Sequence, residues 1–340
     1  MALTEITGVA IRGIISVLPA IQLDNHQLDF GCTPEEKEKI IASTGIHRRR
    51  VVSASQTALD LAKVAASELL AELNWQDEKP ELLIFVTQTP DYMLPGNAIQ
   101  LQHHLNLAKS TIAFDVNLGC SGFVYGLWQI TQLLNGLNCR RALLVVGDTT
   151  STLCPPQQRT VAMLFGDAVS VVALEKTHHQ YRMCFSLGSD GAGAQYLIQP
   201  FAAAKSPVTP AALSMDGTQV FVFTLREVPK SIVEALKGLG WSLKDVDYAI
   251  LHQANAMMLK HLGDKLGFTS EQLIIAMGET GNTSSASIPL AMTMALQEQL
   301  TQSELQLLLS GFGVGWSWGS VALTLPPLSV CRLMNLTTLS

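Results

Sequence analysis

The sequence contains few charged side chains. Only 15% of its 340 residues are Asp, Glu, Lys or Arg, whereas 48% are hydrophobic. The mean hydropathy of +0.26 is high for a globular protein, so we expect a large core and a buried subunit interface. The net charge is −6, which gives no reason to expect a nucleic-acid partner. The length suits one large domain or two fused ones.

Signals for membranes, secretion and metals are also missing. No apolar run reaches the roughly 18 residues that cross a bilayer, and residues 1–5 lack the basic segment of a secretion signal. The six cysteines show neither a C-x-x-C pair nor the spacing of a metal site. We expect five of them to be reduced structural residues, in a cytoplasmic protein that needs no metal or other cofactor and does not contact membranes.

Cys120 is the cysteine whose surroundings predict chemistry. It lies between the apolar run 111–117, which is typical of a strand, and a stretch typical of a helix, 121–134. Backbone N–H groups and the positive end of a helix favour a thiolate, the reactive form of cysteine. Taken alone, a cysteine at a helix start is more often a small core residue, so the prediction depends on its partners.

Two polar residues in the second half of the chain are candidate partners. His252 follows the apolar stretch 246–251, and Asn282 stands in the Gly-Asn-Thr-Ser sequence of residues 281–284. Each also has a structural interpretation, as a buried histidine or as a helix cap. A cysteine, a histidine and an asparagine at three junctions of strand, loop and helix together predict acyl transfer through a thioester.

Strand-like runs alternate with helix-like stretches, which predicts an α/β fold. The order of strands and glycine turns repeats, so we divide the chain into two duplicated halves, residues 1–176 with Cys120 and residues 177–340 with the histidine and the asparagine. In this register Cys120 and Asn282 occupy equivalent helix starts. A two-fold arrangement of the halves would bring both to the centre of the molecule, beside His252.

The individual elements follow from hydrophobic periodicity. We expect strands at 82–87, 111–117, 141–147, 169–174, 248–252, 307–310 and 320–325, and helices at 59–73 and 228–239. Residues 185–216, rich in Gly, Ala, Ser and Pro, predict a connection between the halves with a surface loop. Residues 326–340 show no clear pattern, and no role is assigned to them.

Six motifs match those of one enzyme family in order and spacing. They are Ser-Thr-Gly-Ile (43–46), Gly-Cys-Ser-Gly (119–122), Phe-Gly-Asp-Ala (165–168), His-Gln-Ala-Asn (252–255), Gly-Asn-Thr-Ser (281–284) and Gly-Val-Gly-Trp-Ser-Trp-Gly (313–319). From about Gly8 to about Leu325, the chain resembles the β-ketoacyl-acyl carrier protein synthase III group. The resemblance implies a five-layered α-β-α-β-α thiolase fold, a homodimer and a decarboxylative Claisen condensation.

The resemblance also implies a role for each central residue. Cys120 would take an acyl group from coenzyme A or from an acyl carrier protein. Malonyl-acyl carrier protein would then bind, and His252 and Asn282 would donate hydrogen bonds to its thioester oxygen as CO2 leaves. The backbone N–H groups of Cys120 and Val314 would form the oxyanion hole for attack on the acyl group.

Further residues are implied in substrate binding. Phe165 matches an aromatic gate between the acyl and malonyl sites, and Asn255 matches a contact to the pantetheine arm. Arg159 matches an arginine that contacts the nucleotide of coenzyme A. Leu94 stands where an aromatic residue often reaches across the dimer into the partner's acyl pocket. Gln88, near the expected pocket floor, is more polar than a plain fatty-acid primer requires.

Three positions depart from the pattern of the familiar priming enzymes. Lys39 and Ser43 replace a tryptophan and an arginine that hold the nucleotide, and Met257 replaces an arginine that docks the carrier protein. The sequence therefore leaves the donor open between coenzyme A and a carrier protein. The departures favour a specialised relative, in fatty-acid, polyketide or other specialised biosynthesis, over the housekeeping initiator.

Two alternatives to condensation remain at this point. The acyl group of Cys120 could pass to an alcohol or amine without decarboxylation, or the chain could be a non-catalytic partner subunit of a thiolase-fold heterodimer. The intact set of Cys120, His252 and Asn282 favours condensation over both. The acyl chain length and the pathway do not follow from the sequence.

Overall fold

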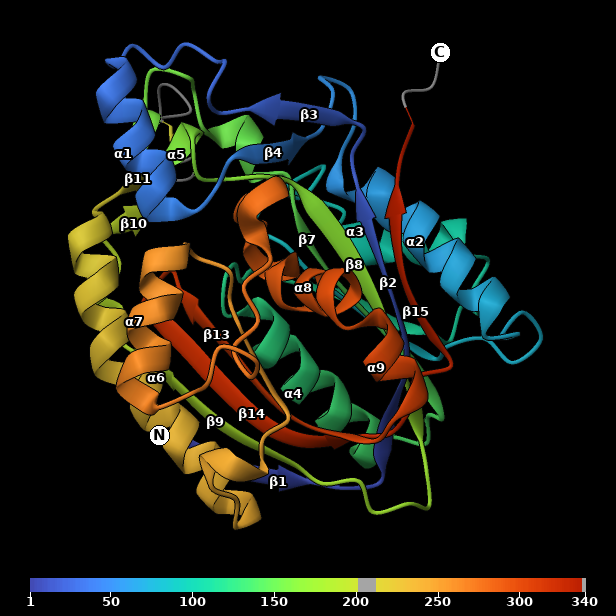
Figure 1. The fold of residues 1–340 in the computed structure, drawn as a ribbon. Coiled ribbons are helices and arrows are strands. Elements are labelled where there is room, and N and C mark those ends of the chain that lie inside the picture. Colours follow the sequence, from blue (N-terminus) through green and yellow to red (C-terminus); the bar gives the residue numbers. More distant parts are fainter. Residues whose placement is uncertain (201–211, 338–340) are drawn as a thin grey trace.

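Two β-sheets organise residues 1–200 and 212–337, the part of the chain that the computed structural model describes (Figure 1). The strands of the larger sheet, in spatial order, are β15 (Val330–Asn335), β2 (Val9–Leu18), β8 (Ala168–Lys176), β7 (Arg141–Asp148), β5 (Leu82–Val86) and β6 (Ile112–Val116). Those of the smaller sheet are β1 (Ala2–Ile6), β9 (Met183–Ser189), β14 (Ser317–Leu325), β13 (Leu305–Gly313) and β12 (Tyr248–Leu251). Two short pairs lie outside them, β3 (Ile21–Asp24) with β4 (Arg48–Val51) and β10 (Leu197–Ile198) with β11 (Ser214–Met215).

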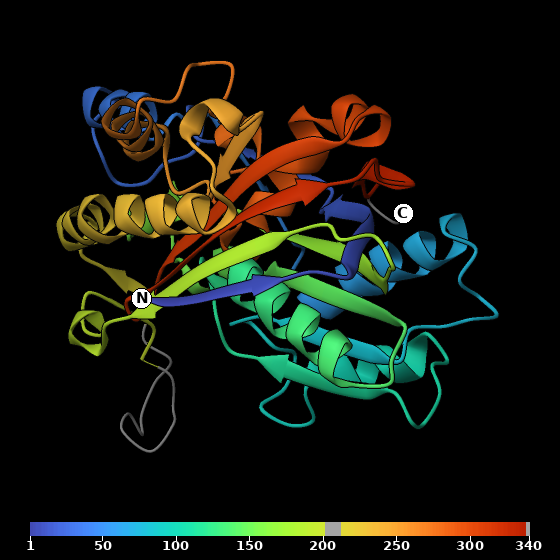
Figure 2. The same ribbon diagram turned by 90° about the horizontal axis from the view of Figure 1, so that it is seen from below.

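Helices form three layers around these two sheets (Figures 1 and 2). The central layer lies between the sheets and consists of α4 (Gly122–Gly136) and α8 (Ser287–Ala295). The outer face of the larger sheet is covered by α2 (Ala58–Glu72) and α3 (Asn97–His104), and that of the smaller sheet by α6 (Gly217–Leu239) and α7 (Ala256–Leu266). The remaining helices are α1 (Pro34–Thr44), α5 (Arg159–Ala162) and α9 (Gln297–Gln302). The five-layered α-β-α-β-α architecture expected from the sequence is present.

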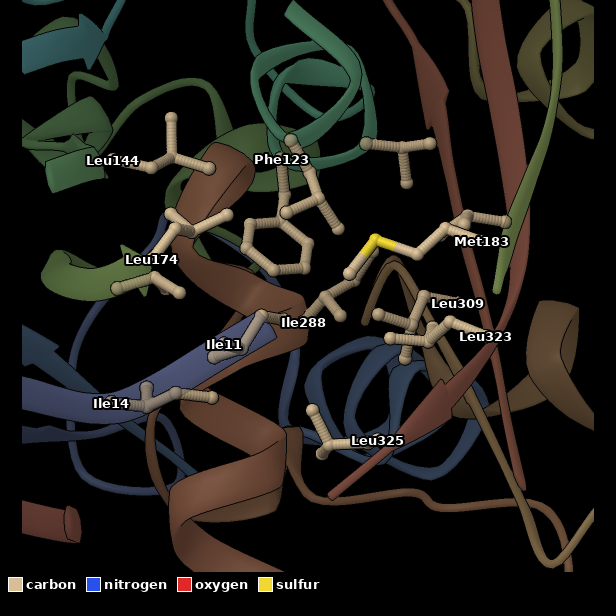
Figure 3. Close-up of a cluster of buried hydrophobic side chains, with 14 of the residues drawn as sticks. Ile11, Ile14, Phe123, Leu144, Leu174, Met183, Ile288, Leu309, Leu323 and Leu325 are labelled. Atoms are coloured by element: carbon tan, nitrogen blue, oxygen red, sulfur yellow. The ribbon is translucent and has the colours of Figure 1, made fainter. Parts of the chain in front are cut away.

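The core explains why the central helices are apolar on nearly every face. Phe123 of α4 and Ile288 of α8 are fully buried between residues of both sheets. Figure 3 shows this cluster, with Ile14 of β2 on one side and Leu309 and Leu323 on the other. Each such side chain contributes about 1.5–3 kcal/mol when it is fully buried. The central layer is therefore a core shared by both sheets.

The parallel strand pairs bring several loops to one place. β5 is parallel to both β6 and β7, so the carboxyl ends of these three strands lie together. β12 and β13 are parallel in the other sheet. Polar residues that follow these strands therefore meet at the carboxyl edges, where α/β proteins commonly bind ligands. Cys120 and His252 both lie in such loops.

Two segments differ from the sequence-based expectation. Residues 183–189 form β9, a buried strand between β1 and β14, because its alternate residues pack against both the central layer and α6. Residues 330–335, which had no assigned role, form β15 and pair in parallel with β2. Part of the expected surface loop, residues 201–211, lies outside the described residues. The division into residues 1–176 and 177–340 stays a prediction.

Among the described residues, no helix combines the length and the hydrophobicity that are needed to cross a bilayer.

Candidate active site

Cys120 lies in the loop between β6 and α4, directly before the N-cap residue of the helix. The residue is only 7% exposed. Two glycines of β13 make room for it. A Cβ atom at Gly313 would stand 2.7 Å from Cys120 Cβ and 3.1 Å from Sγ, and one at Gly311 would stand 2.8 Å from the Cys120 carbonyl oxygen. The candidate nucleophile therefore packs against positions of the second half that tolerate no side chain.

The resting form of Cys120 is a neutral thiol. Burial, and to a lesser degree the nearby Asp148 carboxylate, raise the pKa of this thiol from 9.0 to about 12, while a hydrogen bond with the Ser284 side chain acts against them. This shift corresponds to about 4 kcal/mol, whereas a charge at a helix end gains at most ~2 kcal/mol. Burial thus outweighs the helix start, and the expectation that the helix start makes Cys120 a thiolate is wrong. The thiol proton must leave as the acyl donor reacts.

His252 comes directly after β12, and its backbone N–H donates to the Ser310 carbonyl at 2.7 Å. Its Nδ1 lies 2.7 Å from Ser287 Oγ, which also accepts from the Gln253 N–H at 3.4 Å. When the serine hydroxyl donates to Nδ1, the neutral ring carries its own proton on Nε2. Burial lowers the pKa of His252 to about 3, and a hydrogen bond with the Ser284 backbone opposes this in part. At neutral pH the imidazole thus offers an N–H and no charge.

Asn282 precedes the short 3₁₀ helix Ser284–Ala286, which leads into α8. Its Oδ1 accepts from the Ser284 N–H at 2.9 Å, so the orientation of the amide is set and its NH₂ group is left for another acceptor. The Asn282 N–H donates to the Leu164 carbonyl at 2.9 Å, and the Gly166 N–H donates to the Asn282 carbonyl at 3.0 Å. This backbone bridge holds the amide beside the segment that carries Phe165.

Five of the predicted site residues line one pocket. Cys120, Phe165, His252, Asn255 and Asn282 surround an open space of about 450 Å³. The other lining residues are mainly apolar, namely Leu164, Leu197, Met215, Gly217, Val220, Ala254, Met258, Phe312 and Gly313. A mostly apolar pocket with a thiol and a few hydrogen-bond donors suits a thioester on a flexible arm. No group of three or more His, Cys, Asp or Glu side chains suited to a metal ion occurs in the described part of the chain.

Asn255 has a structural contact as well as a place in the pocket. It is the N-cap of α7, and its Oδ1 accepts from the Met258 N–H at 2.8 Å. The amide NH₂ of Asn255 is the group that remains for a substrate. Val314, the predicted oxyanion residue, directly follows Gly313 of the pocket wall, and its carbonyl accepts from Ser317 Oγ at 2.7 Å.

Three predicted binding residues do not line the pocket of the single chain. Gln88 lies behind the nucleophile loop, where its Nε2 donates to Asn117 Oδ1 at 3.3 Å. Arg159 forms an ion pair with Glu36 at 3.0 Å. Leu94 is 83% exposed in the segment between β5 and α3.

Sequence reasoning missed three residues that support the site. Ser287 contacts the ring of His252, Ser284 orients Asn282, and Asp148 lies near the thiol of Cys120. The signals were present as a run of hydroxyl residues after Asn282 and as an aspartate that ends an apolar strand. Their contacts depend on the packing of the two halves, which a local pattern does not specify.

Known proteins of one family match most of this chain. A family model for "3-Oxoacyl-[acyl-carrier-protein (ACP)] synthase III" matches residues 114–216, and one for the C-terminal part of the same family matches residues 236–325. A β-ketoacyl-[acyl-carrier-protein] synthase III from Levilactobacillus brevis is 36% identical over 317 residues, which cover 90% of this chain and 95% of the relative. Another from Synechocystis sp. is 33% identical over 323 residues, which cover 92% and 97%.

A solved structure has nearly the same fold. The crystal structure of a 3-oxoacyl-(acyl-carrier protein) synthase from Burkholderia xenovorans matches with a TM-score of 0.95 and 39% identity, over 98% of this chain and 99% of the other. Because relatives above 30% identity span almost the whole sequence, and the family models match both halves, this chain belongs to the 3-oxoacyl-[acyl-carrier-protein] synthase III family of thiolase-fold acyltransferases.

Proposed function

We propose that this protein forms a thioester between an acyl group and Cys120 and condenses it with a malonyl thioester. One observation carries the proposal: a thiol, an imidazole N–H and a carboxamide line the same buried pocket. A nucleophile can store the acyl group there, and two neutral donors can stabilise an enolate. The product is a β-ketoacyl thioester for fatty-acid or polyketide synthesis.

The first half-reaction transfers the acyl group. The sulfur of Cys120 attacks the donor thioester, the carbon–sulfur bond of the donor breaks, and the thiol proton goes to the departing carrier thiolate. His252 does not accept this proton, because Nε2 of the neutral ring already carries one and acts as a donor. The acyl-enzyme carries no charge, so the apolar pocket favours it over a buried thiolate.

The second half-reaction forms the carbon–carbon bond. The malonyl carboxylate leaves as CO2, and its bonding electrons become an enolate whose oxygen accepts from His252 Nε2 and Asn282 Nδ2. The enolate carbon attacks the acyl carbonyl, whose oxyanion is held by backbone N–H groups of Cys120 and Val314. The tetrahedral adduct then expels the Cys120 thiolate, which takes up one proton from solvent.

The proposed function can be tested with the purified enzyme and defined thioesters. We expect acyl-enzyme by intact-protein mass spectrometry, then release of CO2 and a β-ketoacyl product when malonyl-acyl carrier protein is added. Acylation without malonyl consumption would favour transfer to an alcohol or amine. If no donor from a broad panel acylated the enzyme, the non-catalytic subunit would become the better explanation.

We also propose that the active form is a homodimer. Tyr92, Met93 and Leu94 are exposed apolar residues in the segment between β5 and α3, and Ile112 of the edge strand β6 is 39% exposed. Such a surface suits a second copy of the chain. Light scattering should give about twice the chain mass of 36.7 kDa, and a monomer at micromolar concentration would contradict the proposal.

A cytoplasmic location fits the six free cysteines.

The ion pair between Arg159 and Glu36 supports a proposal about the carrier of the acyl group. Glu36 of α1 lies 3.0 Å from this arginine, which precedes the pocket residues Leu164 and Phe165. We propose that the enzyme accepts acyl-carrier-protein donors better than acyl-coenzyme A, because the arginine is occupied and the carboxylate repels nucleotide phosphates. The lysine at position 39 cannot stack on adenine.

Glu36→Gln should improve the use of acyl-coenzyme A. Because an exposed ion pair is weak and is screened by salt, we expect KM for acyl-coenzyme A to fall only about two- to five-fold, with KM for acyl-pantetheine unchanged. Glutamine retains the capping box with Thr33, which protects α1. Glu35→Gln on the same turn is the matched control. Equal changes for both substrates, or for both variants, would contradict a nucleotide role for Arg159.

A further inference from the structure

Asp148 is a buried carboxylate that the proposed mechanism does not use. It is the last residue of β7 and is fully buried. Its Oδ1 accepts from the Gln88 N–H at 2.6 Å and from Thr87 Oγ1 at 3.1 Å. Its Oδ2 accepts from Ser285 Oγ at 2.7 Å and from the Ser285 N–H at 3.2 Å. These four donors fill the acceptor positions on both oxygens.

All of these donors are neutral. No ion pair between described residues includes Asp148. A carboxylate without a cationic partner is costly to bury, and hydrogen bonds to the charged form are what offset that cost. An apolar residue or an amide at position 148 would avoid the cost of burying a charge. The buried charge, with hydrogen bonds to both of its oxygens, therefore suggests a role in the active site.

The hydrogen bonds of Asp148 connect the segment after β5 with the turn that contains Asn282. Thr87 and Gln88 follow β5, at the carboxyl edge where the nucleophile loop also lies. Ser285 belongs to the turn that begins at Asn282, in the other half of the chain. Within this turn Ser284 has a positive φ of 51°, which a non-glycine residue adopts only when its surroundings hold it.

The turn is also tied to Asn282 directly. The Ser284 N–H donates to Asn282 Oδ1, and the next N–H in the chain, that of Ser285, donates to Asp148. Of these two successive backbone N–H groups, that of Ser284 orients the Asn282 amide and that of Ser285 anchors the turn to Asp148. A shift of the anchored end moves the amide as well.

We propose that Asp148 is a positioning residue, whose buried negative charge holds the Asn282 turn in place and also acts on Cys120, in the loop that follows the neighbouring strand β6 at the same sheet edge. The first effect rests on the proposed function, because it concerns the amide that would stabilise the enolate. The second effect is electrostatic and is measurable on the resting enzyme without any substrate.

The electrostatic effect has a definite sign. The Asp148 carboxylate adds to burial in raising the pKa of Cys120, so removal of its charge must lower that pKa. Among the pocket-lining residues of the described part of the chain, His252 is the only other titratable side chain, and burial keeps its pKa at about 3. Its charge therefore does not change between pH 6 and pH 10. Thr87, Gln88 and Ser285, which face Asp148 from the packed elements, do not titrate.

Asp148→Asn tests both effects at once. The amide keeps the shape but has one acceptor oxygen, so one of the two backbone N–H groups, of Gln88 or Ser285, is left without an acceptor. We expect iodoacetamide to alkylate Cys120 at pH 8 several-fold faster than in the wild type. We expect condensation to fall at least about ten-fold relative to acylation, since small misplacements of a catalytic group have effects up to about 10²-fold.

Ser285→Ala separates anchoring from charge. It removes one hydrogen bond to Oδ2 but leaves the carboxylate, so condensation should fall several-fold with no rise in the alkylation rate. A merely structural role would slow acylation and condensation equally in both variants, and that result would overturn the proposal. Unchanged alkylation in Asp148→Asn would overturn the electrostatic effect.

Two further measurements keep the proposal testable. If Asp148→Asn does not fold, the pH profile of alkylation of wild-type Cys120 still tests the electrostatic effect. A midpoint at or below about 8.5, the pKa of free cysteine, would overturn that effect. Ser285→Ala then tests whether the hydrogen bond to Asp148 holds the Asn282 turn. If the wild type condenses no thioester, the proposed function fails, while the alkylation rates still report on Asp148.

Discussion

Cys120→Ala is expected to abolish the acyl-enzyme. Cys120 is the one thiol among the described residues that line the pocket, so its loss removes the candidate nucleophile. Removal of a catalytic nucleophile lowers kcat by up to about 10⁶-fold, and we expect condensation to become undetectable. Intact-protein mass spectrometry after incubation with the best acyl donor should show the acyl mass shift in the wild type only.

Cys154→Ala is the matched control. Cys154 is also buried, and burial, aided by the Asp167 carboxylate, raises its pKa to about 12, as in Cys120. The two thiols therefore have similar acidity and differ in position, since only Cys120 lines the pocket. The control variant should be acylated as the wild type is. Acylation that persists in Cys120→Ala and is lost in Cys154→Ala would show that the nucleophile had been placed wrongly.

Thiol acidity does not distinguish the candidate nucleophile Cys120 from Cys154, because burial raises the pKa of both. A low thiol pKa usually marks a reactive cysteine, yet burial raises the pKa of Cys120 to about 12. The acyl donor changes the balance, because transfer to sulfur produces a neutral thioester in place of a buried thiolate. The pocket is suited to the acyl-enzyme and to the enolate oxygen, and these are the species that appear during catalysis.

The sequence predicted the parts of the site that depend on local pattern. Cys120, His252 and Asn282 each follow an apolar strand or glycine turn, and strands such as β5 and β7 have the periodicity of buried sheet. The repeat then predicted that the three residues meet, and the structure places them around one pocket. Their catalytic roles stay predictions that the variants above and below test.

What the sequence did not reveal depends on contacts between distant segments. β9 looked like part of a loop because Gly, Ser and Ala are frequent nearby, but its place between two strands buries it. The hydroxyl of Ser287 could have been a helix cap, and only the packing of α8 beside β12 brings it to the ring of His252. Burial, which determines the pKa of Cys120, is a property of the whole fold.

Substitution of Asn282 is expected to slow condensation while it leaves acylation of Cys120 nearly unchanged. The proposed mechanism uses its amide only when the enolate forms, so Asn282→Ala should leave acylation of Cys120 within about two-fold of the wild type. Condensation should fall by about 10²–10³, the usual effect of removing one donor from an oxyanion site. Single-turnover acylation, followed by release of CO2 from malonyl-acyl carrier protein, measures the two steps separately.

Asn282→Asp distinguishes the donor from the turn. Aspartate retains an oxygen that can accept from the Ser284 N–H, so the turn is preserved, but it replaces the NH₂ donor by a second oxygen. If Asn282 acts by donation, this variant should lose condensation at least as severely as the alanine variant, because a negative charge repels the enolate. If its task were only to shape the turn, aspartate would restore much of the activity, and the enolate would then depend on His252 alone.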